Sequence, residues 1–425
     1  MPGRPLACAG YCGLMARSGW RFTARGLLSA PLVAGGLVYV ACDDGYVYAI
    51  DASSGRPRWR VRRGEPKPNG IFPPLAPVLA GDVLVVAGCL DGFGLPVAVL
   101  GLAAADGAHL WTYPLAGTIV TGLAADEKDV VVTGHSTLSC LDPANGRVRW
   151  TVPAPETNKP WQASLEQPAV GGDHVYAVTR LWGPSTATAD WYLVMAFDRS
   201  TGADAWGVQV DGGGATLTVG GGLVCVGDSE GRFITFHRGT GDAGWSIQVR
   251  PKSGMPIRSG LLPFASPGGA VAIAGQQVDR PVITEQEIYV PSRNGDVHLL
   301  DRDTGELQRV WRVGVPALSI AASDDLLHVG GIQGLLVTLQ RDRREVHWWR
   351  WLPVGRIDAL AVADGLLYVG SGRRLAALNP ATGAGAWRRF PARVRRSSYP
   401  SGTAERELTN EDLPWADTLH RPVRP

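Results

Sequence analysis

The chain has 425 residues, of which 19% are charged and 45% are hydrophobic, and its formal net charge is +2. This balance offers no electrostatic basis for nucleic-acid binding, which depends on many cationic contacts to phosphates. The 55 glycines and 31 prolines suit an all-β chain with frequent turns. A single ordinary core would be too large at this length, whereas a radial repeat lets one domain grow by adding units.

Residues 1–18 are predicted to be an extension that precedes the folded domain. The N-terminal sequence MPGRPLACAGYCGLMARSGW contains no apolar run of seven residues, so we expect no secretory signal. Leu6-Ala7-Cys8 faintly resembles a lipoprotein cleavage site, but no apolar segment comes before it. No stretch approaches the roughly 18 apolar residues of a transmembrane helix. We therefore expect a cytoplasmic protein without a membrane partner.

The six cysteines are scattered, and none belongs to a CxxC or Cys-His spacing. Such a distribution argues against a disulfide framework and against a zinc site. We therefore expect reduced thiols and no bound metal.

The segment from Pro31 to Trp59 shows the unit from which the chain is built. It contains apolar runs at 31–33, 37–41 and 46–50, and a fourth strand is predicted to begin at Trp59. Glycine-containing turns separate the runs, and the last turn is Asp51-Ala-Ser-Ser-Gly. Glycine supplies a positive φ there, and the Asp and Ser side chains can bond backbone donors inside the turn.

The phrase Asp-x-x-Thr-Gly followed four residues later by tryptophan recurs, in variants, eight times along the chain. Copies begin at Asp51, Ala103, Asp142, Asp198, His237, Asp301, Gln340 and Asn379. In the copy at Asp301 the tryptophan is displaced to Trp311, and Arg309 takes its expected place. Several copies are spaced 39 residues apart, as Trp111 and Trp150 are. A period near forty with strand-like content predicts an all-β, eight-bladed β-propeller of four-stranded antiparallel blades over residues 19–390.

The repeated tryptophans are predicted to be structural. A large flat indole can pack between neighbouring blades and bury an area on the order of 150–250 Å². We therefore interpret the set as docking residues and not as an aromatic ligand site: Trp59, Trp111, Trp150, Trp206, Trp245, Trp348 and Trp387.

Two segments compete for the strand that closes the ring. Trp20 lies 39 residues before Trp59, and WRFTARG (20–26) is similar to the fourth strand WRVRRG (59–64). We expect residues 20–24 to pair with the last blade, either near 374–378 or beyond 387–390. The sequence leaves these two positions open.

The repeated phrase resembles the tryptophan-docking repeat of the pyrroloquinoline-quinone-like (PQQ-like) propeller superfamily. The family includes quinoprotein dehydrogenases, an outer-membrane assembly lipoprotein of Gram-negative bacteria, and sensor halves of bacterial kinases. For the dehydrogenases, the resemblance implies a quinone on a calcium ion, a disulfide between adjacent cysteines and a catalytic aspartate. This chain has no adjacent cysteines, and Asp301-Arg302-Asp303 belongs to a blade turn. We therefore expect the non-dehydrogenase branch, with no catalytic residue and no cofactor.

Insertions in the repeat point to one face of the disc. If the strands of a blade are named A to D, the A–B and C–D turns share one face and the B–C and D–A connections share the other. The insertions fall on the second face, at 62–74, 90–96, 153–166, 180–190 and 251–280. Functional loops tend to gather on one rim of a rigid scaffold, so we expect binding on this insertion-bearing face.

The candidate binding residues come from these insertions and from the entry to strand A. Aromatic and cationic residues, which are enriched at interface hot spots, occur in the insertions as Trp161, Trp182, Arg180 and Arg258. Polar residues predicted at the mouth of the central channel are Glu166, Gln167, Asp279, Arg280 and Asp358. The alternatives are that the two tryptophans pin long loops and that the charged residues pair with one another.

Residues 391–425 are rich in Pro, Arg and Ser without periodicity and are predicted to be a disordered tail. Within it, 405–419 carries apolar residues among acidic ones, as a partner-binding motif or as a segment that packs back on the disc. The leading functional hypothesis is a monomeric, non-enzymatic propeller that binds a protein or small ligand. The alternatives are an enzyme with a site in the central channel and an exported outer-membrane assembly factor.

Overall fold

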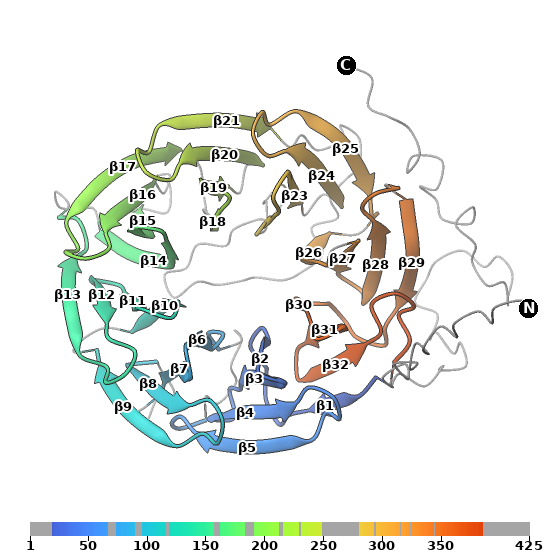
Figure 1. The fold of residues 1–425 in the computed structure, drawn as a ribbon, viewed down its shortest axis with the longest axis horizontal. Coiled ribbons are helices and arrows are strands. Elements are labelled where there is room, and N and C mark those ends of the chain that lie inside the picture. Colours follow the sequence, from blue (N-terminus) through green and yellow to red (C-terminus); the bar gives the residue numbers. More distant parts are fainter. Residues whose placement is uncertain are drawn as a thin grey trace, which may run out of the picture.

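The fold is a closed ring of eight four-stranded antiparallel sheets around a central opening, as Figure 1 shows. This confirms the eight-bladed propeller predicted from the repeat. The structure is a computed structural model, and it describes residues 19–66, 74–89, 96–115, 119–156, 162–182, 191–211, 216–228, 231–248, 280–292, 295–314, 316–323, 325–343 and 345–385.

The first four blades are formed by consecutive strands. They are β2 (Leu32–Ala34), β3 (Leu37–Ala41), β4 (Tyr46–Asp51) and β5 (Pro57–Arg62) in blade 1; β6 (Val78–Ala80), β7 (Val83–Gly88), β8 (Ala98–Ala103) and β9 (His109–Pro114) in blade 2; β10 (Val120–Ala125), β11 (Val130–Gly134), β12 (Thr137–Leu141) and β13 (Val148–Pro153) in blade 3; and β14 (Gln162–Gly171), β15 (His174–Trp182), β16 (Trp191–Asp198) and β17 (Asp204–Asp211) in blade 4.

The last four blades follow the same order except at the end of the ring. They are β18 (Thr216–Gly220), β19 (Leu223–Gly227), β20 (Arg232–His237) and β21 (Ala243–Gln248) in blade 5; β22 (Val282–Ile283), β23 (Glu287–Pro291), β24 (Asp296–Asp301) and β25 (Leu307–Arg312) in blade 6; β26 (Ala317–Ala322), β27 (Leu326–Gly331), β28 (Leu335–Gln340) and β29 (Glu345–Trp351) in blade 7; and β30 (Ala359–Ala363), β31 (Leu366–Ser371), β32 (Arg374–Leu378) and β1 (Arg21–Thr23) in blade 8.

The middle strands of each blade are buried on both sides, whereas the outer strand has one exposed face. In β11 all five residues are buried, and in the outer strand β13 the order is exposed, exposed, buried, exposed, half-buried, exposed. Strands enclosed between two neighbouring sheets read as continuous apolar runs, and strands at a surface alternate. The buried position of β13 is Trp150, so the repeated tryptophan is the inward-facing residue of an otherwise polar strand.

The Asp-x-x-Thr-Gly turns are held by the aspartate. The Oδ1 atom of Asp198 accepts hydrogen bonds from the backbone N–H groups and the hydroxyls of Ser200 and Thr201. These hydrogen bonds favour the charged carboxylate and lower the pKa of Asp198 to about 2. The turn then ends at Gly202, whose φ of +75° suits glycine and few other residues.

At seven of the eight junctions between blades, a tryptophan docks on the turn of the next blade. Its indole Nε1–H donates to the carbonyl of the second residue of that turn, in the pairs Trp20–Ala52, Trp59–Ala104, Trp111–Pro143, Trp150–Arg199, Trp206–Arg238, Trp245–Arg302 and Trp348–Pro380. The ring also covers the glycine of the turn. A Cβ atom placed on Gly202 would lie 2.7 Å from Trp150, so this glycine is required for space as well as for its φ. Trp387, the remaining tryptophan expected to dock, lies outside the described residues.

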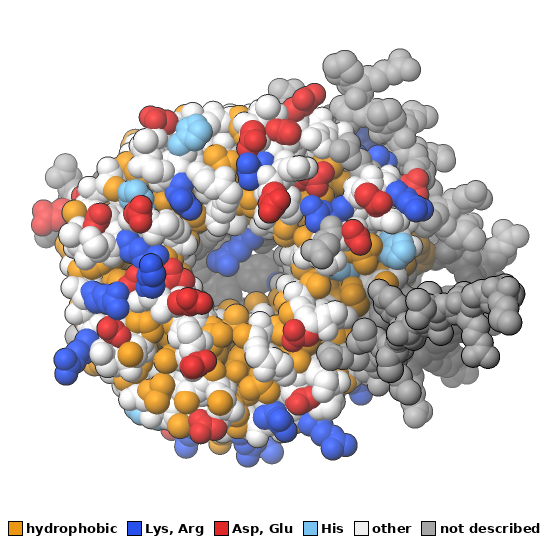
Figure 2. Space-filling view, in the orientation of Figure 1, with side chains coloured by type: hydrophobic (Ala, Val, Ile, Leu, Met, Phe, Trp, Pro, Cys, Tyr) orange, Lys and Arg blue, Asp and Glu red, His pale blue; other side chains and the backbone are white. Residues whose placement is uncertain are grey.

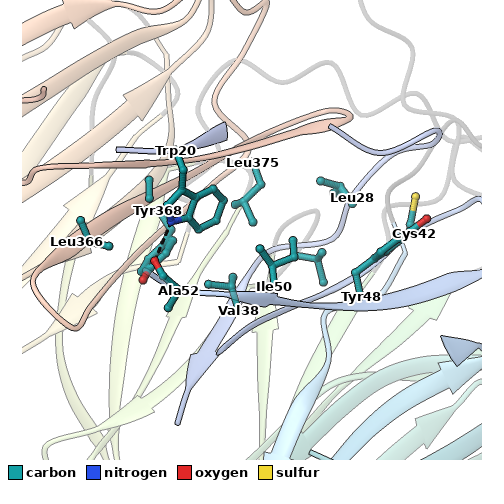
Figure 3. Close-up of a cluster of buried hydrophobic side chains, with 12 residues drawn as sticks. Trp20, Leu28, Val38, Cys42, Tyr48, Ile50, Ala52, Leu366, Tyr368 and Leu375 are labelled. Carbon is teal, nitrogen blue, oxygen red and sulfur yellow. Dashed lines mark hydrogen bonds between the residues drawn. The ribbon is translucent and has the colours of Figure 1, made fainter. Parts of the chain in front are cut away.

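The segment around Trp20 closes the ring. β1 pairs antiparallel with β32, with Phe22 opposite Leu375, so the strand is the outer strand of blade 8. Trp20 then docks on blade 1, where its Nε1–H donates to the carbonyl of Ala52 at 2.7 Å and its ring lies 6.0 Å from that of Tyr368 (Figure 3). Of the two positions left open by the sequence, β1 occupies the one near 374–378; residues 387–390 lie outside the described part of the chain.

The junction between blades 6 and 7 is built differently, because Arg309 stands where the tryptophan is expected. Trp311, two residues later, is 1% exposed and stacks on Tyr289 with the ring centroids 6.3 Å apart. From blade 7, Arg341 donates to the hydroxyl of Tyr289 at 2.9 Å and forms an ion pair with Glu287 at 3.3 Å. Arg341 of blade 7 therefore joins an aromatic stack that lies within blade 6.

The docking of tryptophan on glycine can be tested with two glycines of equal backbone conformation. Gly241 and Gly36 both have a φ of +74°, but a Cβ at Gly241 would lie 2.6 Å from Trp206, whereas one at Gly36 would meet nothing within 4 Å. We expect Gly36→Ala to cost on the order of 1 kcal/mol of unfolding free energy through backbone strain. Gly241→Ala should cost about 1–3 kcal/mol more, the usual cost of overpacking.

Urea or guanidinium titrations of the two variants measure this difference. Trp206→Ala, which removes the ring itself, should destabilise by roughly 3–5 kcal/mol. Equal midpoints for Gly241→Ala and Gly36→Ala would show that the indole does not press on the turn.

Two buried histidines predict a loss of stability in mild acid. Burial lowers the pKa of His298 and of His328 to about 4, whereas an imidazole in the unfolded chain titrates near 6.5. Between pH 6.5 and 4 the unfolded chain therefore binds more protons, so the free energy of unfolding falls as the pH is lowered through this window. The stability contributed by the neutral rings is fully present above pH 6.5.

Denaturation midpoints measured from pH 7.5 to 4.5 check this expectation. The variant His298→Gln/His328→Gln should show a flatter pH dependence than the wild type. The exposed His237→Gln serves as the control and should keep the wild-type slope. A double variant with an unchanged slope would contradict the assignment.

Candidate binding face

Blade 4 extends beyond the other blades on the insertion-bearing face. Its strands have ten, nine, eight and eight residues, whereas no other described strand exceeds seven. The additional rungs pair Gln162 with Trp182, and Leu181 with Trp191, at the ends of the strands where the B–C and D–A connections leave. Four extra residues in a strand add about 13 Å. Blade 4 thus forms a ridge on this face.

The ridge corrects the boundaries expected for two insertions. Arg180 to Trp182 continue β15 and Gln162 to Glu166 belong to β14, whereas the sequence analysis placed both segments in loops. Their polar and apolar residues stay extended because β14 and β15 pair with each other along these rungs. The remaining parts of both insertions, 157–161 and 183–190, lie outside the described residues.

Two exposed tryptophans lie on the insertion-bearing face, and the sequence analysis missed both. Trp191 is 45% exposed at the first residue of β16, and Trp351 is 43% exposed at the last residue of β29. The start of strand C and the end of strand D are both at the B–C and D–A face. Neither tryptophan lies four residues after the glycine of an Asp-x-x-Thr-Gly turn, which is the docking position. This difference in position could have distinguished them from the docking tryptophans in the sequence.

The candidate residues of the insertions are only partly described. Arg180 is half-buried in β15, opposite Ser164 and Tyr192, and the backbone of Trp182 ends the same strand. Arg280 is exposed just before β22. Trp161, Arg258 and Asp279 lie outside the described residues.

Glu166 and Gln167 lie at an irregularity in β14, the inner strand of blade 4. The register shifts after Glu166, and Gln167 has a φ of +48°. The side-chain Oε1 of Gln167 accepts a hydrogen bond at 3.0 Å from the backbone N–H of Leu217 in β18. This contact joins the inner strands of blades 4 and 5.

Asp358 is held within its own blade. Its carboxylate accepts a hydrogen bond from the backbone N–H of Gly372 at 3.0 Å and pairs with Arg356. The contact caps the turn between β31 and β32, on the insertion-bearing face. For Asp358 the structure therefore shows charge pairing, the alternative that the sequence left open.

Two buried charged side chains, Asp129 and Arg63, join neighbouring blades. Asp129, whose side chain is 5% exposed, pairs with Arg149 of its own blade at 2.6 Å and with Arg199 of blade 4 at 2.5 Å. Arg63, 3% exposed, donates from Nη2 to the carbonyl of Cys42 at 2.8 Å and from Nη1 to that of Ala87 in blade 2 at 3.0 Å. These two charges are already paired or hydrogen-bonded, and removing one partner of such a buried group would be costly.

The described residues do not fit a calcium–quinone site. Among them, no three His, Cys, Asp or Glu side chains are grouped so that they could hold a metal ion. The chain also lacks the adjacent cysteines that the dehydrogenase resemblance implies. Across the same described ranges, no helix is long and apolar enough to cross a membrane.

Comparison with known families agrees with the propeller and its repeat. A family model described as "Outer membrane protein assembly factor BamB", built on PQQ-like repeats, matches residues 16–118, 97–191, 161–307 and 293–406. The chain belongs to this family. The match covers nearly the whole ring and runs through all eight blades.

Individual relatives are more distant. The outer membrane protein assembly factor BamB of Burkholderia pseudomallei is 29% identical over 202 residues, which span 44% of this chain and 46% of that protein, so the chain aligns with about half of the relative. Among solved structures, the quinohemoprotein alcohol dehydrogenase ADHIIG of Pseudomonas putida is 12% identical with a TM-score of 0.61, covering 93% of this chain and 79% of that one. The quinohemoprotein alcohol dehydrogenase of Comamonas testosteroni is 13% identical with a TM-score of 0.60, covering 92% and 78%. These structures share the fold.

Proposed function

We propose that this chain is a non-enzymatic propeller scaffold that binds a protein partner through its insertion-bearing face. The observation that supports it most directly is the ridge of blade 4, which ends in the exposed indole of Trp191. A folded monomer seldom leaves large aromatic side chains in water on a raised edge, and tryptophan is enriched among interface hot spots.

The proposal concerns one face because the two faces differ in kind. The A–B and C–D turns carry short glycine turns and the docking contacts, which leave little freedom to vary. The B–C and D–A connections carry the insertions, the ridge and the two exposed tryptophans. A rigid ring with variable connections on one side is the usual way in which a repeat scaffold presents a binding surface.

Outer-membrane assembly is the second candidate function, and the family match favours it. The matching model and the Burkholderia relative are both described as an outer membrane protein assembly factor. In that role the insertion-bearing face would contact another protein of an assembly complex. A quinoprotein enzyme is not favoured, because the residues described above do not fit its cofactor.

The binding role is tested by removing the two exposed indoles. We expect Trp191→Ala/Trp351→Ala to leave the unfolding midpoint nearly unchanged, because both side chains are over 40% exposed. The same variant should recover roughly tenfold less partner, the effect of about 1.4 kcal/mol, in quantitative affinity purification from the native host.

The control removes equally exposed side chains near the C–D turns. Leu110→Ala/Val148→Ala changes two residues that are each 47% exposed at the other end of outer strands β9 and β13. Partner recovery should stay at the wild-type level in this control. Equal recovery by both double variants would contradict the proposed face.

A further inference from the structure

A groove of about 480 Å³ runs along the outer rim where the ring closes, between β1 of blade 8 and β5 of blade 1. Its walls include Phe22 from β1, and Tyr48 and Trp59 from blade 1. Phe22 and Tyr48 contact each other with ring centroids 5.4 Å apart. The groove therefore offers aromatic surface on a part of the molecule far from the ridge of blade 4.

The charge around the groove is positive. Arg25, Arg58 and Arg60 line it, all three are exposed, and the described lining residues include no Asp or Glu. Figure 2 shows Lys and Arg side chains gathered along this rim, over β1 and β5. The Cζ atom of Arg60 lies 5.0 Å from the centroid of the Tyr46 ring. Arg58 forms a long ion pair with Asp51, in which Nε is 3.7 Å from Oδ2.

The neighbouring carboxylates are already engaged. Asp51 Oδ1 accepts hydrogen bonds from Ser53 and Ser54 in its turn, and Asp44 accepts one from the hydroxyl of Tyr48 at 2.7 Å. Exposed guanidinium groups beside aromatic rings favour a ligand that brings both carboxylates and an aromatic side chain.

We propose that the groove binds the segment 405–419 of this same chain. The segment, ERELTNEDLPWADTL, holds five carboxylates and one arginine, a net charge of −4, together with Trp415. Trp415 fits the aromatic walls, where an indole buries on the order of 150–250 Å². Glu411 and Asp412, on the N-terminal side of Trp415, then face the guanidinium groups of the rim.

The path of the chain permits this contact. The last described residue, Gly385, bridges to Leu378 at the end of β32, the strand that pairs with β1. Glu405 lies twenty positions after Gly385, and an extended chain over that interval reaches about 65–70 Å. At Gly385 the chain that leads to this segment therefore leaves from blade 8, the blade that forms one wall of the groove. This inference goes beyond the proposed partner-binding function and uses a different surface.

Photo-crosslinking in the full chain tests the inference. With Trp415 replaced by p-benzoylphenylalanine, we expect crosslinks within one chain to residues 22–25 or 57–60, identified by mass spectrometry. Arg25→Glu/Arg60→Glu should reduce their yield about tenfold. Arg147→Glu/Arg343→Glu, which reverses two exposed arginines on blades 3 and 7, is the matched control and should leave the yield unchanged.

A second variant tests the same contact without altering the propeller. Glu411→Lys/Asp412→Lys reverses the charge of the segment and should remove the same crosslinks while the unfolding midpoint stays constant. Crosslinks that map elsewhere on the disc, that join two chains, or that persist in both charge-reversal variants would overturn the proposal.

Discussion

The contact between an indole and the turn of the next blade is the interaction on which this structure depends. It combines three requirements at one place: a hydrogen bond from Nε1–H to a turn carbonyl, a flat ring over the turn, and a glycine that leaves room for the ring. Trp111 meets all three on the turn that contains Pro143 and Gly146. Because seven of the eight junctions contain this contact, it links successive blades around almost the whole ring.

The ring closes by the same contact. β1 adds only three paired residues to blade 8, and a pairing of that length would be weak alone. Trp20, however, docks on blade 1 in the same way as the other indoles dock on their neighbours. The closing strand is therefore held along its length by β32 and, at its N-terminal end, by the docking of Trp20 on Ala52. Only the junction of blades 6 and 7 departs from this among the described blades, and there Trp311, Tyr289 and Arg341 replace the indole contact. A propeller tolerates one different junction because each blade contacts only its neighbours.

The number of blades, their strand order and the closing segment could be predicted from the sequence, because each depends on a repeated phrase with a fixed period. What each indole contacts could not, because the receiving carbonyl and glycine belong to the next repeat and meet the ring only in space. The same limit applies to the candidate site. Arg180 and Trp182 look like an insertion because the strand that pairs with them, from Gln162 onward, departs from the length of every other blade.

Residues that serve the ring and residues that face outward also looked alike in the sequence. Gln167 and Asp358 are polar residues at the entry to strand A, and both form contacts that hold strands or turns. Trp191 and Trp351 resemble the docking set in residue type, yet both are exposed. The groove between β1 and β5 joins the first and last blades, so no local pattern predicts it. Position relative to the docking contact, more than residue type, separates these classes.

Hydrogen exchange of the indole N–H groups, followed by NMR on protein labelled with ¹⁵N-tryptophan, tests the central claim most directly. If the docked ring unfolds cooperatively, the indole protons of Trp20, Trp59, Trp111, Trp150, Trp206, Trp245 and Trp348 should exchange slowly and with one common opening free energy, equal to the global value. The indole of Trp351, which is 43% exposed and does not dock on a turn, should exchange fast. Rapid exchange at Trp20 while the other docked indoles stay protected would contradict closure by β1, and rapid exchange at all of them would contradict the docking account.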